Sequence, residues 1–494
     1  MGEPESGRTG EQEGRFFFHR FADSCFPDSP IPRFAHSPIP FQMRLSFDLG
    51  TLVLRDPPQD FYPPACFQWD GRVDRWRAQA YHYRAVIEQF RQSKLTFDNT
   101  APAYRTLKLT SRLTQAPHPF QSEAIAAWQS AGRRGVVVLP TGAGKSYVGQ
   151  MAIETVQRGT LVVAPTIDLL NQWYDLLCAA FGEQIGLIGG GYYEVQDITV
   201  TTYDSAYNHM DRLGNRWGLV IFDECHHLPG EMYSHAAEMC LAPYRLGLTA
   251  TPERTDGRHI LLDELIGPQV YAKGIKELAG EYLADYIVER VRVTLTPEEE
   301  EEYKRARSTF SNFLIDHGIV LDGLAGWHRF VRESAVSRKG RQAMLAHQRS
   351  KKLALGTSAK LRTLDYLLKK HARERVLIFT SDNDTVYAIS TAFLIPAITH
   401  QTPTKERKEI LEAFNRGEYL ALATSKVLNE GVNVPEASVA IILSGSGSTR
   451  EHVQRLGRVL RKREGKQAIL YEVVTAGTVE ESISRRRRQH DAYQ

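Results

Sequence analysis

The sequence has no apolar run approaching the roughly 20 residues that a helix needs to cross a bilayer, so we expect no integral membrane protein. Cysteine is scarce: the 494 residues contain five, and no two form a Cys-x-x-Cys pair. This pattern argues against a disulfide framework or a zinc site and favours a reduced, cytoplasmic protein. An excess of one sign of charge is also nearly absent, since 61 lysines and arginines stand against 58 aspartates and glutamates and the net value is +3. That value permits a polyanionic partner without requiring one.

Basic residues are nevertheless clustered in two places. One cluster is the run of four arginines from Arg485 to Arg488, and the other lies in the middle of the chain. Such clusters form either a solvated surface or a nucleic-acid contact, and both interpretations stay open. The residues of the middle cluster are Arg338, Lys339, Arg341, Arg349, Lys351 and Lys352.

The chain divides by composition into five stretches. Residues 1–42 are rich in Pro, Ser, Gly and Glu and predict a disordered tail. A small α/β domain is expected at 43–110, an α/β lobe at 111–290, a charged helical insertion at 291–355, and a second α/β lobe at 356–494. In both lobes short apolar runs alternate with helical patterns, which predicts parallel sheets covered on both faces. The expected strands are Val136–Leu139, Leu161–Ala164, Ile198–Thr201, Leu219–Phe222 and Arg245–Thr249 in the first lobe, and Val376–Phe379, Leu420–Ala423, Val439–Leu443 and Ala468–Tyr471 in the second.

A phosphate-binding loop is the clearest chemical signal. An apolar strand runs into Thr141-Gly-Ala-Gly-Lys-Ser146, and a helical pattern follows. In such a loop the turn around Gly142 and Gly144 lets backbone N–H groups cradle phosphates, Lys145 reaches the β- and γ-phosphates, and the Ser146 hydroxyl binds Mg²⁺. Leu139 stands where the longer consensus has glycine, so the match covers the core of the motif. The alternative is a surface turn.

Two adjacent carboxylates, Asp223 and Glu224, end the apolar strand Leu219–Phe222. Ligands of parallel sheets bind at the carboxyl ends of the strands. We therefore expect Asp223 to hold Mg²⁺ and Glu224 to orient the attacking water. The alternative is a strand that ends in a helix-capping aspartate. His226 and His227 have no cysteine or histidine partner at zinc spacing.

In this order the motifs resemble those of superfamily 2 helicases. After the phosphate loop and Asp223-Glu-Cys-His226 come Leu248-Thr-Ala-Thr-Pro252 and Gln454-Arg-Leu-Gly-Arg-Val-Leu-Arg461, and the resemblance covers about Pro117 to Arg461. It implies an α/β fold with two RecA-like parallel-sheet lobes and an ATP·Mg²⁺ site.

The resemblance also implies roles for further residues. Gln121 would recognise the adenine, Thr141 and Gly431 would belong to the nucleotide site, and Arg458 and Arg461 would act as arginine fingers. Residues expected to couple hydrolysis to lobe closure are His226, Thr249, Thr251 and Gln454, and those expected to track the nucleic-acid strand are Thr166, Thr202, Thr380 and Thr424.

The residues ahead of the first lobe, from Trp69-Asp70 to Tyr83, resemble the damage-recognition domain of XPB helicases, as do Gly267-Pro268 and the insertion between the lobes. We therefore interpret 43–110 as such a domain and 291–355 as a thumb-like insertion. That family carries an Arg-Glu-Asp triplet after the third motif. Here Arg254-Thr255-Asp256 stands in its place, and the missing carboxylate bears on the melting of damaged DNA more than on ATP hydrolysis.

Aromatic residues in these two stretches have two interpretations. In the insertion they alternate with arginine and lysine, which suits stacking on bases, but helical spacing is also typical of a packed core. In the front domain we expect Trp69, Tyr81 and Tyr83 to form the core. The insertion aromatics are Tyr303, Phe310, Phe313, Trp327 and Phe330.

The resulting hypothesis is an ATP-dependent DNA helicase or translocase of the XPB type. The family implies 3′–5′ polarity, a role in nucleotide excision repair or a related DNA transaction, single-stranded or forked DNA as partner, and a possible partner nuclease. Two alternative functions are also enzymatic: an RNA helicase, and the motor of a restriction system. A third alternative is a non-processive, ATP-gated clamp or scaffold that opens DNA.

Overall fold

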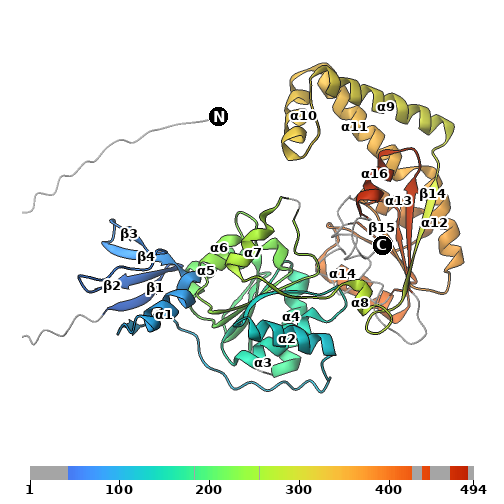
Figure 1. Cartoon of the computed structure of the whole chain (residues 1–494). Coiled ribbons are helices and arrows are strands. Elements are labelled where there is room, and N and C mark those ends of the chain that lie inside the picture. Colours follow the sequence, from blue (N-terminus) through green and yellow to red (C-terminus); the bar gives the residue numbers. More distant parts are fainter. Residues whose placement is uncertain (1–42, 183, 255, 426–436, 446–467, 488–494) are drawn as a thin grey trace, which may run out of the picture. The chain divides into compact units, whose positions relative to one another are not determined.

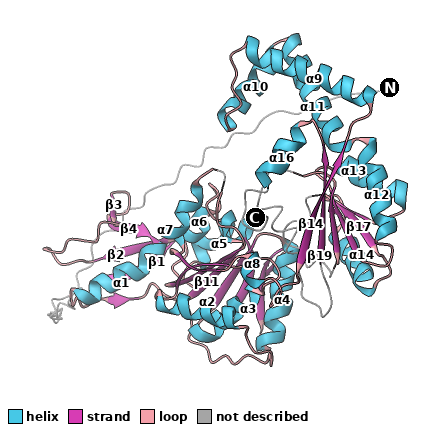
Figure 2. Cartoon of the chain, turned by 45° about the vertical axis from the view of Figure 1, so that its right-hand side comes forward, coloured by secondary structure: helices cyan, strands magenta, loops and turns pink. Residues whose placement is uncertain are grey.

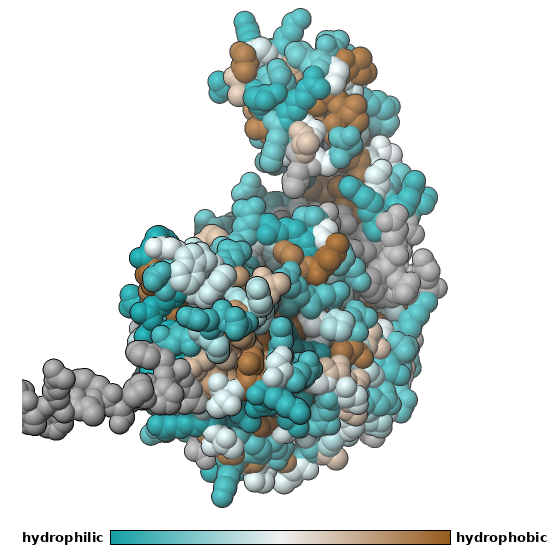
Figure 3. All heavy atoms as spheres, turned by 60° about the vertical axis from the view of Figure 1, so that its left-hand side comes forward, coloured by the Kyte–Doolittle hydropathy of each residue, from teal (hydrophilic) through white to brown (hydrophobic). Residues whose placement is uncertain are grey.

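The structure is a computed structural model, and it describes residues 43–182, 184–254, 256–425, 437–445 and 468–487. The expected tail at 1–42 lies outside the described residues, as do Cys25, Thr255 and Arg488. The described residues form three sheets, and Figure 1 and Figure 2 show helices packed against them, with α9 (Pro297–Asp316) and α10 (Leu324–Val336) extending away from the sheets. Among the described residues no helix is both long and apolar enough to cross a membrane. In the face drawn in Figure 3, hydrophilic side chains dominate and apolar ones form small, separate patches.

The front domain is a five-stranded sheet with one longer helix. The strand order is β3-β4-β2-β1-β5, in which β5 runs parallel to β1 and the other pairs are antiparallel. Its core is built on Leu45, Leu52 and Phe90, and Leu241 of the following lobe packs into the same cluster. The elements are β1 Arg44–Asp48, β2 Thr51–Arg55, β3 Gln68–Asp70, β4 Arg75–Gln79, the 3₁₀ turn Ala80–His82, α1 Tyr83–Gln92 and β5 Asp98–Asn99.

The expected core of this domain is right at two positions and wrong at one. Tyr81 and Tyr83 are buried. Trp69, by contrast, is 51% exposed, because it lies on the short edge strand β3 and only one side of its ring packs against Trp76.

The first lobe contains an eight-stranded sheet of order β13-β6-β12-β11-β7-β10-β8-β9. Every neighbouring pair is parallel except β8 and β9. The five expected strands are confirmed, and β8, β9 and β13 are additions. The strands are β6 Arg134–Val138, β7 Thr160–Ala164, β8 Ile185–Gly189, β9 Tyr192–Glu194, β10 Ile198–Thr202, β11 Leu219–Asp223, β12 Tyr244–Thr249 and β13 Gln269–Ala272.

Helices cover the faces of this sheet (Figure 2). Their buried residues form one apolar cluster with the inner strands, to which Val148 and Trp173 contribute. The helices are α2 Pro119–Ser130, α3 Lys145–Val156, α4 Ile167–Phe181, α5 Tyr203–Leu213, α6 Ser234–Glu238, α7 Leu261–Leu265 and α8 Ile275–Leu278, with 3₁₀ turns at Cys225–His227 and Arg258–Ile260.

The second sheet has six parallel strands in the order β14-β19-β18-β15-β17-β16. The four expected strands are confirmed. The addition β14 pairs with β19 along its whole length, from Tyr286↔Ala468 to Val293↔Thr475, so the expected limit at residue 290 falls inside a strand of the second sheet. The elements are β14 Tyr286–Val293, α12 Ser358–Lys370, β15 Val376–Phe379, α13 Asn383–Phe393, β16 Ala397–Ile398, α14 Thr404–Arg416, β17 Ala421–Thr424, β18 Val439–Ile442, β19 Ala468–Thr475 and α16 Val479–Arg487.

The insertion is helical, with α9 Pro297–Asp316, α10 Leu324–Val336 and α11 Arg338–Gly356 (Figure 1). A capping box starts α9: the Thr296 hydroxyl accepts from the N–H of Glu299, and the Glu299 carboxylate accepts from the N–H of Thr296. Phe310, Phe313 and Phe330 are buried against one another in the centre of these helices. Of the two interpretations of these aromatics, the structure therefore favours core packing.

Candidate nucleotide-binding site

The phosphate loop connects β6 to α3 through two glycines that have left-handed backbone conformations. Gly142 has φ 91° and Gly144 has φ 75°, values that other residues rarely adopt. A Cβ on Gly144 would lie 2.5 Å from Nε2 of Gln121, so a side chain is excluded here. Lys145 is the first residue of α3, which places its side chain at the positive end of the helix dipole. The turn therefore leaves open backbone at the start of a helix, as phosphate binding needs.

Gln121 supports this loop from the adjacent helix α2. Its side chain is buried, its Nε2 donates to the carbonyl of Ala143 at 3.0 Å, and its Oε1 accepts from the N–H of His118 at 2.9 Å. Both ends of the amide are thus engaged by the backbone of the chain. Recognition of an adenine by Gln121 stays a prediction; the amide keeps a second N–H donor and a second acceptor lone pair for it.

Asp223 ends β11 in a buried position directly behind the loop. Its Oδ2 accepts from Nε1 of Trp173 at 2.8 Å, and its Oδ1 accepts from the N–H of Glu224 at 3.0 Å. Burial, followed by the charge of Glu224, raises the pKa of Asp223 to about 6. The carboxylate is therefore held in place by two donors, but its charge is poorly compensated, which suits it to a cation.

Glu224 is held in a left-handed conformation with φ 45°, which is unfavourable for a residue that carries a side chain. Its Oε1 lies 3.4 Å from Nζ of Lys145, and its Oε2 lies 3.5 Å from Nδ1 of His226. The side chains of Lys145 and Glu224 are only 10% and 11% exposed. The strained turn thus brings the second carboxylate over the phosphate loop and pairs it with the loop lysine.

A chain of close polar contacts leads from this pair to the end of β12. The buried His226 places Nδ1 3.0 Å from Oγ1 of Thr249, and that oxygen also accepts from the N–H of Thr251 at 3.2 Å. Arg254 donates from Nη1 to the carbonyl of His226 at 2.7 Å. The three expected coupling residues His226, Thr249 and Thr251 therefore lie together beside Glu224.

Arg254 and Asp256, which flank position 255, pair with each other. Arg254 forms a two-bond ion pair with Asp256, with Nε to Oδ1 at 2.9 Å and Nη2 to Oδ2 at 2.6 Å. Since Arg254 also holds His226, this pair is connected to the nucleotide site. Sequence reasoning gave Arg254 no part in that network, because its contact with His226 spans 28 positions of the chain.

The donor set fits Mg²⁺ that is shared with phosphates. Among the described residues no group of three His, Cys, Asp or Glu side chains could hold a metal by itself. What the site offers is the Asp223 carboxylate, the hydroxyl of Ser146, and the Oγ1 of Thr141, which is buried and has no hydrogen-bond partner in the structure. A hard cation that keeps waters and takes its other ligands from a substrate is bound in this way.

The four threonines expected to follow a strand fall into two classes. Thr166 lies two residues after β7, and Thr202 ends the neighbouring strand β10. Each caps the next helix by accepting an N–H at 3.2 Å, from Leu169 and from Ser205. In the second sheet Thr380 and Thr424 are fully buried. Thr380 uses its hydroxyl to donate to the carbonyl of Asp382 at 2.8 Å. Gly431, Gln454, Arg458 and Arg461 lie outside the described residues.

Trp173 and Tyr203 are site residues whose function the sequence analysis missed. Trp173 donates to the Asp223 carboxylate, and the Tyr203 hydroxyl donates to the Asp223 carbonyl at 3.0 Å. The signal that could have found them is that both are aromatic residues with a polar donor, and such residues usually find a partner when they are buried.

The glycine loop, Lys145 and the two carboxylates at the end of β11 define a P-loop nucleoside triphosphatase lobe, and a second parallel sheet beside it in the sequence is the arrangement of a helicase. Solved structures agree on the fold: the helicase domain of Hef from Pyrococcus furiosus aligns with a TM-score of 0.50 at 19% identity, over 76% of this chain and 98% of that one.

Family models give the more specific result. Residues 45–101 match the Xeroderma pigmentosum group B helicase damage recognition domain, residues 114–254 the res subunit of type III restriction enzymes, and residues 340–494 the ERCC3/RAD25/XPB C-terminal helicase. The DNA 3′-5′ translocase XPB2 of Sulfurisphaera tokodaii is 41% identical over 87% of this chain and 97% of its own length. The DNA 3′-5′ helicase XPB of Kineococcus radiotolerans is 32% identical over 77% of this chain and 63% of its length. The chain therefore belongs to the XPB family of ATP-dependent helicases.

Proposed function

We propose that the chain is an ATP-dependent DNA helicase or translocase with 3′–5′ polarity that acts in nucleotide excision repair or a related DNA transaction. The observation that carries the proposal is the group formed by Lys145, Asp223 and Glu224 at one edge of a parallel sheet. Within this proposal the first lobe binds ATP, the second lobe completes the cleft, residues 43–110 contact damaged DNA, and residues 291–355 form a thumb-like insertion.

The pairing of Lys145 with Glu224 suggests how the site waits for its substrate. Each of the two side chains compensates the charge of the other, with Nζ and Oε1 3.4 Å apart. A γ-phosphate would draw Nζ of Lys145 towards itself and free the Glu224 carboxylate to orient a water and accept its proton. Mg²⁺ held by Asp223 and Ser146 would supply charge neutralisation on the phosphates. Hydrolysis would thus begin when the ion pair is exchanged.

The chain from Glu224 through His226 to Thr249 offers a route by which occupancy reaches the end of β12. Release of Glu224 from Lys145 changes what faces Nδ1 of His226, which also contacts Thr249. Since Thr249 in turn holds the backbone of Thr251, a change at the nucleotide can shift the segment that follows β12. The arginines Arg458 and Arg461 are proposed to complete the site from the second lobe.

The test is an ATPase assay of the purified protein with single-stranded, duplex and forked DNA and with RNA, run beside strand displacement. We expect DNA to stimulate ATP hydrolysis and a 3′ tail to be required for displacement. Stimulation by RNA alone would overturn the DNA assignment. Stimulation without any displacement or translocation would favour the clamp. Co-purification with a nuclease, the one partner protein the family suggests, is tested on the native protein, and its absence would remove that partner only.

A further inference from the structure

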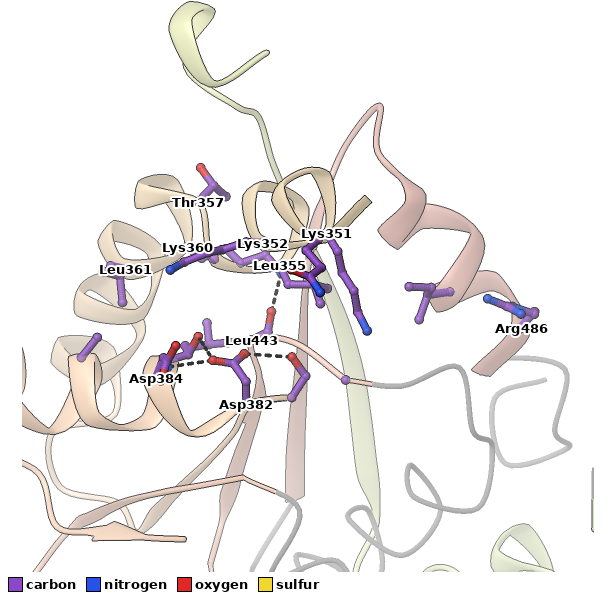
Figure 4. Close-up of a pocket in the computed structure, with 17 residues that line it drawn as sticks. Lys351, Lys352, Leu355, Thr357, Lys360, Leu361, Asp382, Asp384, Leu443 and Arg486 are labelled. Carbon is purple, nitrogen blue, oxygen red and sulfur yellow. Dashed lines mark hydrogen bonds between the residues drawn. The ribbon is translucent and has the colours of Figure 1, made fainter. Parts of the chain in front are cut away.

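A pocket of about 720 Å³ opens at the carboxyl edge of the second sheet. Four segments line it: the end of α11 with the start of α12, the turn from β15 into α13, the residues after β18, and α16. Figure 4 shows Lys351 and Lys352 reaching from α11 over Asp382 and Leu443, with Arg486 on α16 across from them. The described residues that line this pocket belong to the second sheet and to the helices packed on it, including the end of insertion helix α11.

The pocket lies where the strand order of the sheet reverses. From β15 the chain proceeds to β16 and β17 on one side, and then returns to β18 and β19 on the other side of β15. β15 continues into α13, and a crevice lies between the end of β15 and the residues that follow β18. In open parallel sheets this crevice is where ligands bind. The second sheet thus has a ligand position of its own, separate from the loop at Lys145.

Three cations at this crevice have no charge partner within the described part of the chain. Lys351, Lys352 and Arg486 are exposed, and no described carboxylate oxygen lies within 4.0 Å of their nitrogens. Among the described exposed cations of α11, α12 and α16, Arg349 pairs with Glu302 and Lys369 with Asp365, and others have no carboxylate partner either. What distinguishes Lys351, Lys352 and Arg486 is that all three line the same pocket. Unpaired cations that converge on one pocket favour an anionic ligand.

The carboxylates of the pocket do not cancel this charge. Asp382 caps α13: its Oδ1 accepts from the N–H and the hydroxyl of Thr385 at 2.9 Å, and its Oδ2 accepts from the Ser381 hydroxyl at 3.1 Å. Asp384 lies in the first turn of the same helix, where the dipole favours a negative charge. The three cations thus face two carboxylates, and both of these stabilise the start of helix α13 and do not pair with the cations.

The floor of the pocket is fixed before any ligand arrives. Lys360 is buried, pairs with the buried Glu480 at 2.7 Å and donates to the carbonyl of Leu443. Glu480 accepts in turn from the N–H of Thr475 at 2.8 Å. The Ser444 hydroxyl accepts from the N–H of Ser381 at 2.8 Å, which ties the end of β18 to the turn after β15. A preformed, half-apolar pocket with a few charged groups at its rim is typical of a binding site.

We propose that this pocket binds one sugar–phosphate unit of the nucleic-acid strand, with the phosphate between Lys351, Lys352 and Arg486 and the sugar against Leu355, Leu443 and Ile483. The inference rests on the proposed function, because the strand is the one on which the motor acts. It adds two elements to the grip of the second lobe: the last turn of insertion helix α11 and the C-terminal helix α16. The insertion would thus hold the strand with lysines and not with its aromatic core.

The test measures binding of a fluorescent oligo(dT) strand to the full chain by anisotropy across a series of salt concentrations. For single strands the slope of log K against log salt is about 0.7 per neutralised phosphate. We expect Lys351→Ala/Lys352→Ala to bind at least tenfold more weakly at low salt and to lower the slope by roughly 0.7, the value for the one phosphate of the proposal. Arg486→Ala should weaken binding at low salt and lower the slope by at most the same amount. Lys351→Arg/Lys352→Arg should retain the slope of the wild type.

The matched control is Lys339→Ala/Arg341→Ala, which removes the same charge from the same helix at exposed positions that do not line the pocket. An equal loss in this control, or an unchanged slope in the pocket variants, would overturn the proposal. Binding of ADP and of inorganic phosphate is measured for the wild type and for the pocket variants. If only the pocket variants lose binding of ADP or of phosphate, the pocket belongs to a free anion and not to the strand. If DNA fails to stimulate the wild-type ATPase the proposed function fails; if it stimulates and the variants bind normally, only the pocket assignment fails.

Discussion

The two parallel sheets of this chain carry their charged groups in opposite ways. At the edge of the first sheet the charges are buried and paired, with Lys145 against Glu224 and Asp223 behind them. At the edge of the second sheet the cations Lys351 and Lys352 are exposed and have no carboxylate partner among the described residues.

This difference matches two kinds of anion. A buried edge with two carboxylates repels phosphate unless a metal accompanies it, so it is suited to a nucleotide that arrives with Mg²⁺. An exposed cationic edge accepts phosphate without a metal and releases it easily, as a strand that must move requires. The same sheet architecture thus serves a chemical site and a tracking site, and burial is what separates them.

The largest effect is expected when the first edge loses its paired charges. Glu224→Gln and Lys145→Ala should each lower DNA-stimulated ATP hydrolysis by at least about 100-fold, since each removes a group that acts on the reacting phosphate. The measurement is steady-state phosphate release at saturating DNA. Glu231→Gln is the matched control, because Glu231 is an exposed acid of the same segment, and it should keep wild-type turnover. Turnover within tenfold of the wild type in Glu224→Gln would show that the edge is not the hydrolytic site.

The nucleotide site was predictable from the sequence because its residues are contiguous. Thr141 to Ser146 and Asp223-Glu224 each follow an apolar strand directly, so a strand assignment places them at the same edge. The pocket of the second sheet was not predictable, because Lys351, Ser381, Leu443 and Arg486 come from four distant segments. A local pattern showed only that Lys351 and Lys352 belong to a basic cluster.

Strand β14 shows a second limit of sequence reasoning. Tyr286 to Val293 carries three charged residues and runs into the acidic start of α9, so its sequence gives only a weak strand signal. It is a strand because β19 offers an unpaired edge, and pairing from Tyr286 to Val293 satisfies both backbones. Trp69 fails for a related reason, since its burial depends on whether any element covers β3.

The pocket at the edge of the second sheet depends on the buried pair of Lys360 and Glu480 that forms its floor. Lys360→Met and Glu480→Gln should each destabilise the protein by about 3 to 5 kcal/mol, because each leaves the other charge buried and uncompensated. Lys360→Met/Glu480→Leu should lose much less, since it removes both charges. Urea unfolding followed by circular dichroism gives the free energies of the double-mutant cycle. Single variants that lose under about 1 kcal/mol would show that the pair does not fix the pocket floor.

The first edge should also be sensitive to pH. Asp223 has its pKa raised from 3.8 to about 6, so between these values the folded protein binds a proton that the unfolded chain does not. Its contribution to the free energy of unfolding is therefore present below pH 4 and is lost as the pH rises through about 6, by roughly 2 to 3 kcal/mol. The difference in stability between the wild type and Asp223→Asn, measured by urea unfolding from pH 4 to 7, should change by this amount in favour of the variant. A pH-independent difference would mean that Asp223 is already compensated.

The smallest effect concerns the acids at the edge of the second sheet, which stabilise the start of helix α13 and do not bind a ligand. Asp384→Asn removes a carboxylate that faces Lys351 and Lys352 across the pocket, and we expect strand affinity to rise about two- to threefold at low salt, with the gain disappearing at high salt. Glu406→Gln is the matched control: Glu406 is an exposed acid in the first turn of α14 in the same lobe, and it does not line the pocket. Both variants should lose a similar helix-dipole contribution, roughly 0.3 to 1 kcal/mol, so a difference between their strand affinities reports the pocket alone. A fall in affinity with Asp384→Asn would mean that this acid takes part in binding, as the acids of the first sheet do, and the contrast between the two edges would then be lost.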